Sequence, residues 1–446
     1  TRLPCNKVKA GHGCKRLPSP LNVDPLIATV PPPRKDKFLE WIRELLTHSF
    51  VLDIMSTTLK SSWEHIEKLV DEVHKAQAAG LSWEKMDLAQ LCPGIGIFHT
   101  PLPLAEAFEA YDSKYHISKR RFVRPSFNEV RHILNLAQMW AIAEDLKLLT
   151  LDGDCTLYAD GKAFEDRAMG WSICRLLNDG VYVALVTAAG YGLDAVKYEA
   201  RIALLLQAFT EFGLSAEAKG RFFVLGGECN YLLQCGPNSR LVALEETEWN
   251  DGKILHGWKQ SDVDKLLDTA NATFVDAIGE LGLRARIIRK ERAVGMIALD
   301  EHGKVENPKL TATLRRELLD ECVLRIHDAI KHIDTPLPFC AFNGGSDVWV
   351  DIGNKSVGVS ALQEFLEVKQ SKSLHLGDQF SVTGNDKAAR NVAATLWVIA
   401  PIETAKCLRT ILGRRGIACD DKGMPAAADS EVGEGAGVAA APNGGP

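Results

Sequence analysis

Two aspartates, Asp152 and Asp154, stand one residue apart in the turn DGDCT, at the end of the short apolar run LLTLD. A buried strand that ends in this way delivers side chains to the carboxyl edge of a sheet. Two carboxylates held so closely away from water repel each other unless a cation compensates them. A third carboxylate, Asp378, follows another apolar run in LHLGDQF. Because Mg2+ prefers oxygen ligands of this kind, the three residues predict a magnesium site.

Two further residues supply what phosphoryl transfer needs. Thr187 ends the apolar run VYVALVT, and Lys355 leads a predicted helix in DIGNKSVGVSALQEFL. Asp152 can attack phosphorus, Asp154 can protonate the leaving oxygen, and Thr187 and Lys355 can hold the phosphate oxygens. Taken by themselves, the two aspartates fit a turn or a helix cap equally well. The DGDCT turn, Thr187, Lys355 and the GD loop with Asp378, in this order along the chain, however, indicate a phosphoryl-transfer enzyme.

These side chains need a parallel sheet to bring them together. The strand 148–152, a helix at 168–177 and the strand 181–187 form a β-α-β pattern, which predicts parallel strands. The carboxyl ends of such strands meet at one edge, where ligands bind. The runs VWVDIG, LHLGDQF and TLWVIA are expected to return to the same sheet.

The pattern along the chain predicts several segments. Helical spacing of apolar residues begins after a Pro-rich leader. A long stretch separates the two halves of the parallel pattern, and it includes a predicted helix over 198–212 and the runs RFFVLG and SRLVALEE. The predicted segments are an extended leader at 1–35, an N-terminal helical domain at 36–146, a sheet core at 147–189 and 346–412, an inserted domain at 190–345 and a disordered tail at 413–446.

Composition excludes several classes of protein. The chain has 446 residues, of which 46% are apolar and 25% charged, as in ordinary globular proteins. Lys and Arg number 52 against 58 Asp and Glu, so the formal charge of -6 gives no global field for nucleic acid. The apolar runs are too short to span a membrane. Eleven cysteines at irregular spacing do not form a disulfide framework, which favours a reducing, cytoplasmic location.

The motifs resemble those of the haloacid dehalogenase-like phosphatase superfamily. Its motifs are DxDxT, here Asp152 to Thr156, then a Thr or Ser after a strand, a Lys, and an acidic GD loop. The insertion between the second and third motifs resembles the bulky α/β cap of one branch. The resemblance implies an α/β fold: a haloacid dehalogenase-like parallel (Rossmann-like) sheet core with a large inserted α/β cap domain at 190–345, beside the N-terminal helical domain.

Longer segments narrow the resemblance. The stretches LTLDGDCTLYADG, VTAAGYG, FVLGGECNYL, FNGGSDVWVDIGNKSVGV and LGDQFSVTGNDKAAR are similar to the IMP-specific 5'-nucleotidase family, over roughly residues 36–412. Membership implies hydrolysis of inosine 5'-monophosphate (IMP) to inosine and phosphate with Mg2+. It also implies a homotetramer that ATP activates allosterically, which makes 36–146 a regulatory domain.

The resemblance assigns the catalytic and metal-binding roles. The family's nucleophile falls on Asp152 and its proton donor on Asp154. Magnesium would be held by Asp152, by the main-chain carbonyl of Asp154 and by Asp378. These roles agree with those that the residue types suggest.

The resemblance also assigns the substrate contacts, namely Asp154, Asp160, Thr187, Ala188, Asp347 and Lys355. An ionised carboxylate only accepts hydrogen bonds, so Asp160 and Asp347 suit hydroxyl or ring N–H groups. Their other reading is structural: Asp160 as a turn residue beside Gly161 and Asp347 as a cap-like residue after Ser346.

A basic cluster upstream of the sheet is the candidate ATP site. Its members are Lys114, His116, Lys119, Arg120, Arg121, Arg124, Arg131 and His132. The cluster can receive a triphosphate, or it can be a solvated or subunit-bridging face. The resemblance selects Lys114 and His132 as residues of the ATP site.

Two other functions remain open at the level of sequence. A sugar-phosphate phosphatase or phosphomutase of the same superfamily would share the four motifs, since these recognise phosphate and say little about the leaving group. A catalytically idle nucleotide-sensing scaffold would keep the basic cluster without the reaction, and the intact set of acidic residues, Thr187 and Lys355 argues against it.

Overall fold

The computed structural model describes residues 36–51, 59–92, 95–250, 258–299, 303 and 315–419. All of them lie within the compact unit Arg34–Pro446. The predicted leader and residues 420–446 of the predicted tail lie outside the described residues.

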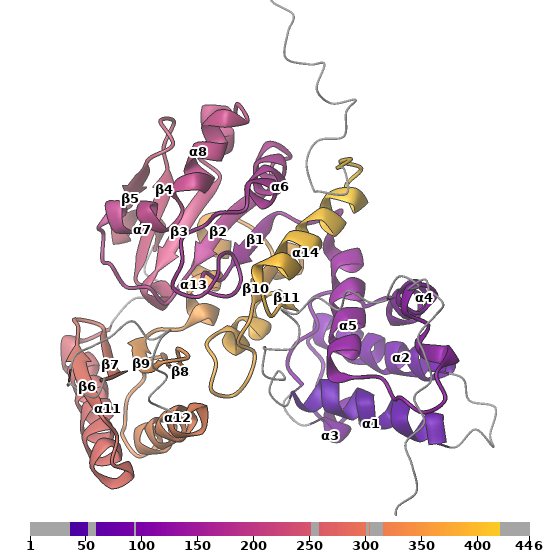
Figure 1. Cartoon of the computed structure of the whole chain (residues 1–446), viewed down its shortest axis with the longest axis horizontal. Coiled ribbons are helices and arrows are strands. Elements are labelled where there is room, and N and C mark those ends of the chain that lie inside the picture. Colours follow the sequence, from indigo (N-terminus) through magenta and orange to yellow (C-terminus); the bar gives the residue numbers. More distant parts are fainter. Residues whose placement is uncertain are drawn as a thin grey trace, which may run out of the picture. The chain divides into compact units, whose positions relative to one another are not determined.

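One large sheet carries the strands that end at the predicted catalytic residues. Its strands are β1 Leu148–Leu151, β2 Tyr182–Val186, β3 Phe222–Gly226, β4 Tyr231–Cys235, β5 Leu241–Ala243, β10 Ser373–Gly377 and β11 Ala394–Trp397. The order is β11-β10-β1-β2-β3-β4-β5, and the first five strands run parallel (Figure 1). The last two pair antiparallel. The predicted parallel sheet is therefore confirmed.

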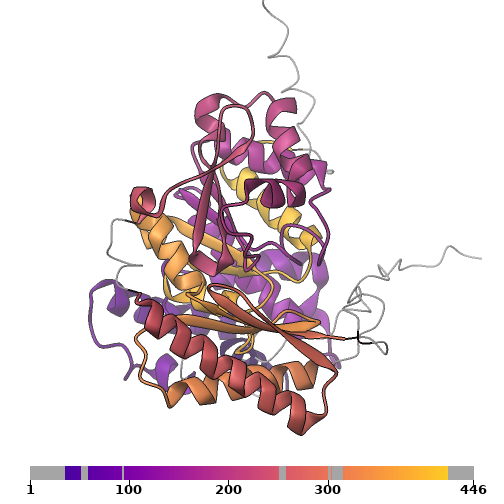
Figure 2. The same ribbon diagram turned by 90° about the vertical axis from the view of Figure 1, so that its left-hand side faces the viewer.

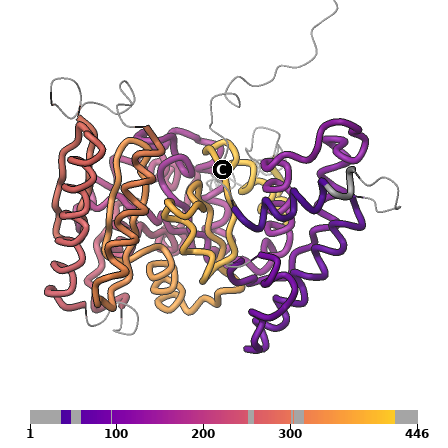
Figure 3. Tube along the Cα trace, turned by 90° about the horizontal axis from the view of Figure 1, so that it is seen from below, coloured from indigo at the N-terminus to yellow at the C-terminus, as the bar shows by residue number. Residues whose placement is uncertain are grey.

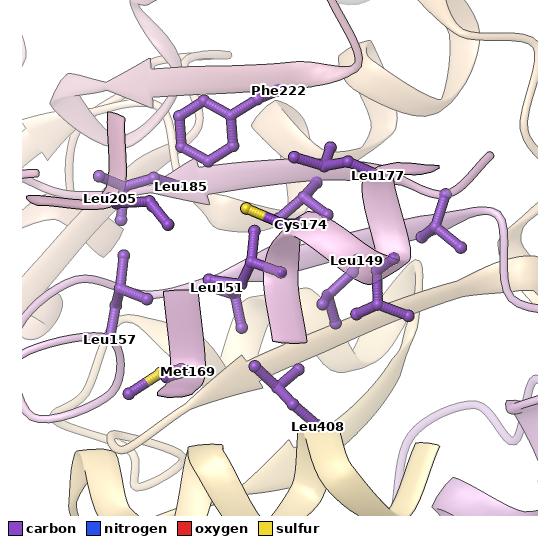
Figure 4. Packing of buried hydrophobic residues seen from close by; sticks show 14 of the residues in the cluster. Leu149, Leu151, Leu157, Met169, Cys174, Leu177, Leu185, Leu205, Phe222 and Leu408 are labelled. Carbon is purple, nitrogen blue, oxygen red and sulfur yellow. The ribbon is translucent and has the colours of Figure 1, made fainter. Parts of the chain in front are cut away.

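Helices cover both faces of this sheet because its strands are apolar on both sides. Leu149 and Leu151 of β1 belong to one apolar cluster (Figure 4). Leu148 belongs to the cluster on the opposite face. The first cluster includes residues of the helices α6 Arg167–Asn178, α8 Ala203–Glu211, α9 Ala216–Lys219 and α14 Pro401–Arg414. The second includes residues of α10 Glu246–Trp249 and α13 Lys355–Phe365.

A second, antiparallel sheet lies in the later part of the chain. Its strands are β6 Ala285–Arg289, β7 Ala293–Ala298, β8 Phe339–Asn343 and β9 Asp347–Ile352, in the order β6-β7-β9-β8. The helices α11 Gln260–Leu281 and α12 Arg316–Lys331 cover one face of it (Figure 2). Val348, Val350 and Ile352 are in that apolar cluster. Alternation along β9 places Asp347 and Trp349 on the other face.

Three details of the chain differ from the expectations. VWVDIG does not rejoin the parallel sheet, since β9 pairs antiparallel with β7 and β8. RFFVLG and SRLVALEE do not belong to the antiparallel sheet, since β3 and β5 extend the large one. An expected helix over 198–212 is broken at Ile202 into α7 Ala195–Arg201 and α8. A short apolar run reads alike in either sheet, because its pairing partner is not local. The limits predicted for the domains remain a prediction.

The N-terminal part is helical, as expected. It contains α1 Lys37–Val51, α2 Leu59–Ala78, α3 Asp87–Leu91, α4 Leu104–Tyr115 and α5 Phe127–Ile142, drawn in indigo to violet in Figure 3. Trp63, Ile66 and Phe108 lie in its apolar core. Ser126 and Glu129 form a capping box that starts α5. Among the described residues, no helix has both the length and the apolar character that a membrane span requires. The cysteines that the structure describes are all free.

Candidate active site

The parallel strands end where the sequence places its acidic residues. Asp152 directly follows β1, Thr187 directly follows β2, and Asp378 directly follows β10. Since β1 pairs with both β2 and β10, the three residues leave the sheet at one edge, side by side. The order of the strands thus brings together groups that lie up to 226 residues apart in the chain.

A buried lysine lies between two of the carboxylates. Lys355 starts α13, where the side chain of Asn354 caps the helix by accepting from Val357 N. Its Nζ lies 2.5 Å from Asp152 Oδ1 and 2.5 Å from Asp386 Oδ1. Lys355 and Asp386 are 0% exposed and Asp152 is 6% exposed. The structure therefore brings the predicted nucleophile and the predicted phosphate-binding lysine into contact.

Asp386 is an acidic residue of the site that the sequence did not indicate. Its Oδ1 also accepts from His375 Nε2 at 3.0 Å, and its Oδ2 accepts from Gln379 N at 2.7 Å. The other ring nitrogen of His375 lies 2.9 Å from Thr150 Oγ1. Because a carboxylate cannot donate, Nε2 carries the proton and Nδ1 accepts from the threonine. The segment GDQFSVTGND gave a signal, an Asp in the same loop as Asp378, but Gly384 and Asn385 make it read as a turn.

The electrostatics of the cluster follow from burial and proximity. Burial raises the pKa of Asp152 to about 7, although Lys355 opposes the shift. Burial and the neighbouring Asp152 raise the pKa of Asp378 well above its usual range. Burial would also raise the pKa of Asp386, but Lys355 and His375 outweigh it and hold that pKa below the usual range. The site therefore has more negative charge than Lys355 compensates, which favours a cation.

The donor set fits a hard divalent cation. Oxygen atoms of Asp152, Asp378 and Asp386 lie within 4.8 Å of one another. Asp386, however, already accepts hydrogen bonds from Lys355, His375 and Gln379. Its oxygens are thus engaged, and Asp152 and Asp378 are the better ligands. Asp378 is half-buried, and its role as a metal ligand remains a prediction.

Asp154 is oriented by two donors on the outer side of the loop. Its Oδ1 accepts from Gly161 N at 2.6 Å and from Arg201 Nη2 at 2.8 Å. The guanidinium of Arg201 lies 4.7 Å from the ring centre of Tyr158, which holds the arginine in place. Arg201 has no local signal in the sequence, because its contact with Asp154 spans 47 residues. Asp154 is partly exposed, as a group that exchanges protons with water must be.

Thr187 lies beside the loop that carries the two catalytic aspartates. A Cβ on Gly153 would come within 3.4 Å of Thr187 Oγ1. That oxygen accepts from Ala189 N at 3.1 Å, which closes a tight turn around Ala188. The threonine is 3% exposed and Ala188 is half-buried. The Thr187 hydroxyl therefore lies beside Gly153, the residue between Asp152 and Asp154.

The remaining predicted substrate contacts come from opposite sides. Asp160 is exposed in the loop after Asp154, and Asp347 begins β9 of the antiparallel sheet. Burial raises the pKa of Asp347, and the nearby charges of Asp160 and Asp154 add to the shift, while a hydrogen bond from the Trp349 side chain opposes it. Asp347 therefore lies near enough to Asp160 and Asp154 to be affected by their charges.

The predicted ATP residues lie in the helical region. Lys114 lies over the Tyr115 ring, Tyr115 packs on Tyr111, and the Tyr111 hydroxyl is 3.1 Å from His132 Nδ1. His132 Nε2 lies 3.0 Å from an oxygen of Glu403 in α14.

The basic cluster is partly internal. Arg131 is 1% exposed and binds Glu403 and the carbonyl of Trp397, and Arg120 pairs with Glu129. These two side chains support the fold, so they offer little charge to a ligand.

The comparisons with known proteins agree with this geometry. The family model described as IMP-specific 5'-nucleotidase matches residues 29–408. IMP-specific 5'-nucleotidase 1 of Plasmodium falciparum is 37% identical over 85% of this chain and 83% of that protein. The Schizosaccharomyces pombe protein of the same name is 38% identical over 84% of this chain and 94% of its own.

Solved structures of an IMP-nucleotidase are also similar to this chain. A mutant of Plasmodium falciparum IMP-nucleotidase bound to IMP superposes with a TM-score of 0.78, at 36% identity, over 85% of this chain and 94% of that one. An ATP-bound structure of that nucleotidase gives 0.74, at 36% identity, over 84% of each chain. These similarities confirm the predicted fold class.

Proposed function

Since the chain belongs to the IMP-specific 5'-nucleotidase family, we propose that it hydrolyses IMP to inosine and phosphate at the carboxyl edge of its parallel sheet. The single observation that supports this most is the contact of Lys355 with Asp152, beside Asp378. A carboxylate nucleophile, a lysine for the phosphate and a second carboxylate for a cation are the parts that phosphomonoester hydrolysis requires.

Mg2+ fits the donor set of this site. Asp152 and Asp378 would hold it, together with the main-chain carbonyl of Asp154 that the family resemblance suggests. When bound, the ion neutralises charge on the phosphate oxygens and on the crowded carboxylates. The residues themselves carry out the bond making and breaking.

In the first step, a carboxylate oxygen of Asp152 attacks phosphorus and the bond from phosphorus to the ribose O5' breaks. Asp154 gives its proton to the departing oxygen, so inosine leaves neutral. Lys355 has three N–H donors, and its contacts with Asp152 and Asp386 use two of them. The third donor and the Thr187 hydroxyl bind the phosphate oxygens. The product on the protein is an aspartyl-phosphate.

In the second step, Asp154 takes a proton from water as the water oxygen attacks the phosphorus of the aspartyl-phosphate. The bond between phosphorus and Asp152 breaks, which returns the Asp152 carboxylate and releases inorganic phosphate. Asp154 thus ends protonated, ready for the next substrate. Arg201 and Gly161 N keep the Asp154 carboxyl directed during both transfers.

Recognition of the nucleoside is assigned to the two outer aspartates. Asp160 and Asp347 accept hydrogen bonds from ribose hydroxyls or from a purine ring N–H, while Ala188 contributes its main chain near the phosphate. The electrostatic coupling of Asp347 with Asp160 and Asp154 supports this placement.

ATP activation is part of the same proposal. Lys114 and His132 bind the nucleotide, and the contact of His132 with Glu403 gives a path to α14, which packs on the large sheet. By family resemblance the enzyme is a homotetramer in the cytoplasm.

The decisive experiment compares wild-type protein with Asp152→Asn. The variant keeps an oxygen for Lys355 but loses the nucleophile, so it should fold normally and release phosphate from IMP at least about 10³-fold more slowly. Asp145→Asn, at a carboxylate with a 74% exposed side chain, is the matched control and should be fully active. Near-wild-type phosphate release by Asp152→Asn would refute the covalent route. Preference for a hexose phosphate over IMP would refute the assigned substrate.

A further inference from the structure

A buried glutamate outside the described mechanism lies at the end of β3, next to the site. Glu228 belongs to a single helical turn, Gly227–Cys229, and is 0% exposed. Since β3 runs parallel to β2, the turn that follows β3 emerges at the same edge of the sheet as Thr187, which follows β2. None of the roles assigned above uses this carboxyl.

The main chain of Glu228 holds the loop that carries Thr187. Glu228 N donates to Thr187 O at 3.1 Å, and Gly227 N donates to Ala189 O at 3.1 Å. The two hydrogen bonds bracket Ala188. The position of the threonine hydroxyl relative to Asp152 is therefore set by the turn at Glu228.

The side chain of Glu228 holds the other phosphate-binding region. Its Oε1 accepts from Asn385 Nδ2 at 2.9 Å. Asn385 precedes Asp386, whose carboxylate binds Lys355. The start of α13 also packs on the turn, because a Cβ on Gly358 would lie 3.0 Å from Glu228 O. One residue thus contacts the elements that carry Thr187, Lys355 and Asp386.

This position is costly for a glutamate. Its φ of 64° is in the left-handed region, where the backbone of a residue with a side chain is strained. Its Oε2 is buried without a hydrogen-bond partner among the described residues, and burial raises its pKa to about 7. Glycine would avoid both costs, so the contacts of the side chain are what offset them.

We propose that Glu228 is a positioning residue that fixes the spacing between the Thr187 loop and the Asn385–Asp386 loop, and through Asp386 the place of the Lys355 ammonium. The inference rests on the proposed function. Loss of the carboxyl frees Asn385, lets the two loops shift independently and misplaces the groups that hold the phosphate. A misplacement of about 1 Å is enough to lower turnover about 100-fold.

The experiment measures kcat and KM for IMP with Mg2+, and the melting temperature, for wild type and four variants. Glu228→Ala should lower kcat about 100-fold. Glu228→Gln keeps an acceptor for Asn385 and should restore kcat to within about threefold of wild type. Asn385→Ala removes the same hydrogen bond from its other end, and the double variant should be no slower than either single one, because the two residues act as a unit. Asn385→Ala also serves if Glu228→Ala folds poorly.

Glu367 provides the matched control. It is an exposed glutamate with a φ of 53°, so Glu367→Ala removes a carboxyl at a similarly strained backbone position that plays no part in the site and should leave kcat unchanged. Wild-type kcat in Glu228→Ala or Asn385→Ala, or additive losses in the double variant, would overturn the inference while leaving the proposed function intact. Absence of IMP hydrolysis by the wild-type protein would instead overturn the proposed function.

Discussion

Removal of the Lys355 ammonium tests how the site is held together. In the structure, Nζ lies 2.5 Å from both Asp152 and Asp386, and the lysine side chain is 0% exposed. Lys355→Met keeps the apolar stem and removes the charge. Two buried carboxylates then lose their common partner, and breaking a buried ion pair from one side costs about 3–5 kcal/mol. At ~2 °C per kcal/mol for a large domain, the melting temperature should fall by about 6–10 °C.

The assay is thermal unfolding followed by tryptophan fluorescence, first with a chelator and then with Mg2+. A divalent cation compensates the same carboxylates, so Mg2+ should raise the melting temperature of Lys355→Met more than that of wild type. Phosphate release should be lost under both conditions, because the cation does not replace the donor to the phosphate.

Lys197→Met is the control for the charge change. Lys197 has a 62% exposed side chain and lies 3.1 Å from Asp194, so its removal should change the unfolding free energy by less than about 0.5 kcal/mol. A chelator-treated Lys355→Met that melts within 2 °C of wild type (about 1 kcal/mol) would refute the reasoning. The buried ion pairs of Lys355 would then make no net contribution to the stability of the fold.

Three other predictions concern Glu403, the cation and Asp347. Burial opposes ionisation of Glu403, but His132 and Arg131 hold its pKa at about 2 against a usual 4.5. The resulting ~3 kcal/mol of stability is present above pH 4.5 and is lost as the pH falls towards 2. The unfolding free energies of Glu403→Gln and wild type, measured by denaturation, should therefore differ at pH 7 and converge near pH 2. Chelation should abolish phosphate release from IMP and added Mg2+ should restore it; full activity after dialysis against a chelator would exclude the Asp152–Asp378 cation. Asp347→Asn should raise KM for IMP about tenfold, as expected for about 1.4 kcal/mol of lost hydrogen bonding, while hydrolysis of a small phosphomonoester stays unchanged; equal effects on both substrates would remove Asp347 from nucleoside recognition.

The strands that end at residues of the candidate site could be predicted from the sequence. LLTLD, VYVALVT and LHLGD each combine an apolar run with a terminal polar residue, so the existence of β1, β2 and β10 and the placement of Asp152, Thr187 and Asp378 at their ends were predicted. The β-α-β pattern also predicted that neighbouring strands run parallel, as β1 and β2 do.

Pairing between distant segments was the part that failed. VWVDIG has the same composition as a buried parallel strand, yet β9 pairs with β7 and β8. RFFVLG was assigned to the insertion, yet β3 pairs with β2. Strand pairing depends on the whole topology, so a run of Val, Ile and Phe carries no record of its partner.

The residues that support the site could also not be identified from the local sequence around them. Asp386, His375 and Glu228 are an aspartate in a turn, a histidine in an apolar strand and a glutamate after two glycines, and each resembles an ordinary structural residue in the sequence. Their roles come from contacts that span 31 residues for Lys355 with Asp386 and 157 for Asn385 with Glu228.

The amino-acid sequence by itself determined which groups are present and at which ends of strands they stand, because strand periodicity and the residues that end a strand are local properties. Only the tertiary structure decided that Lys355 lies between Asp152 and Asp386 and that Glu228 joins two loops of the site. Such contacts exist only once the strand order of the sheet has closed gaps of up to 203 residues, and burial then gives the carboxyl groups the pKa values that free side chains do not have.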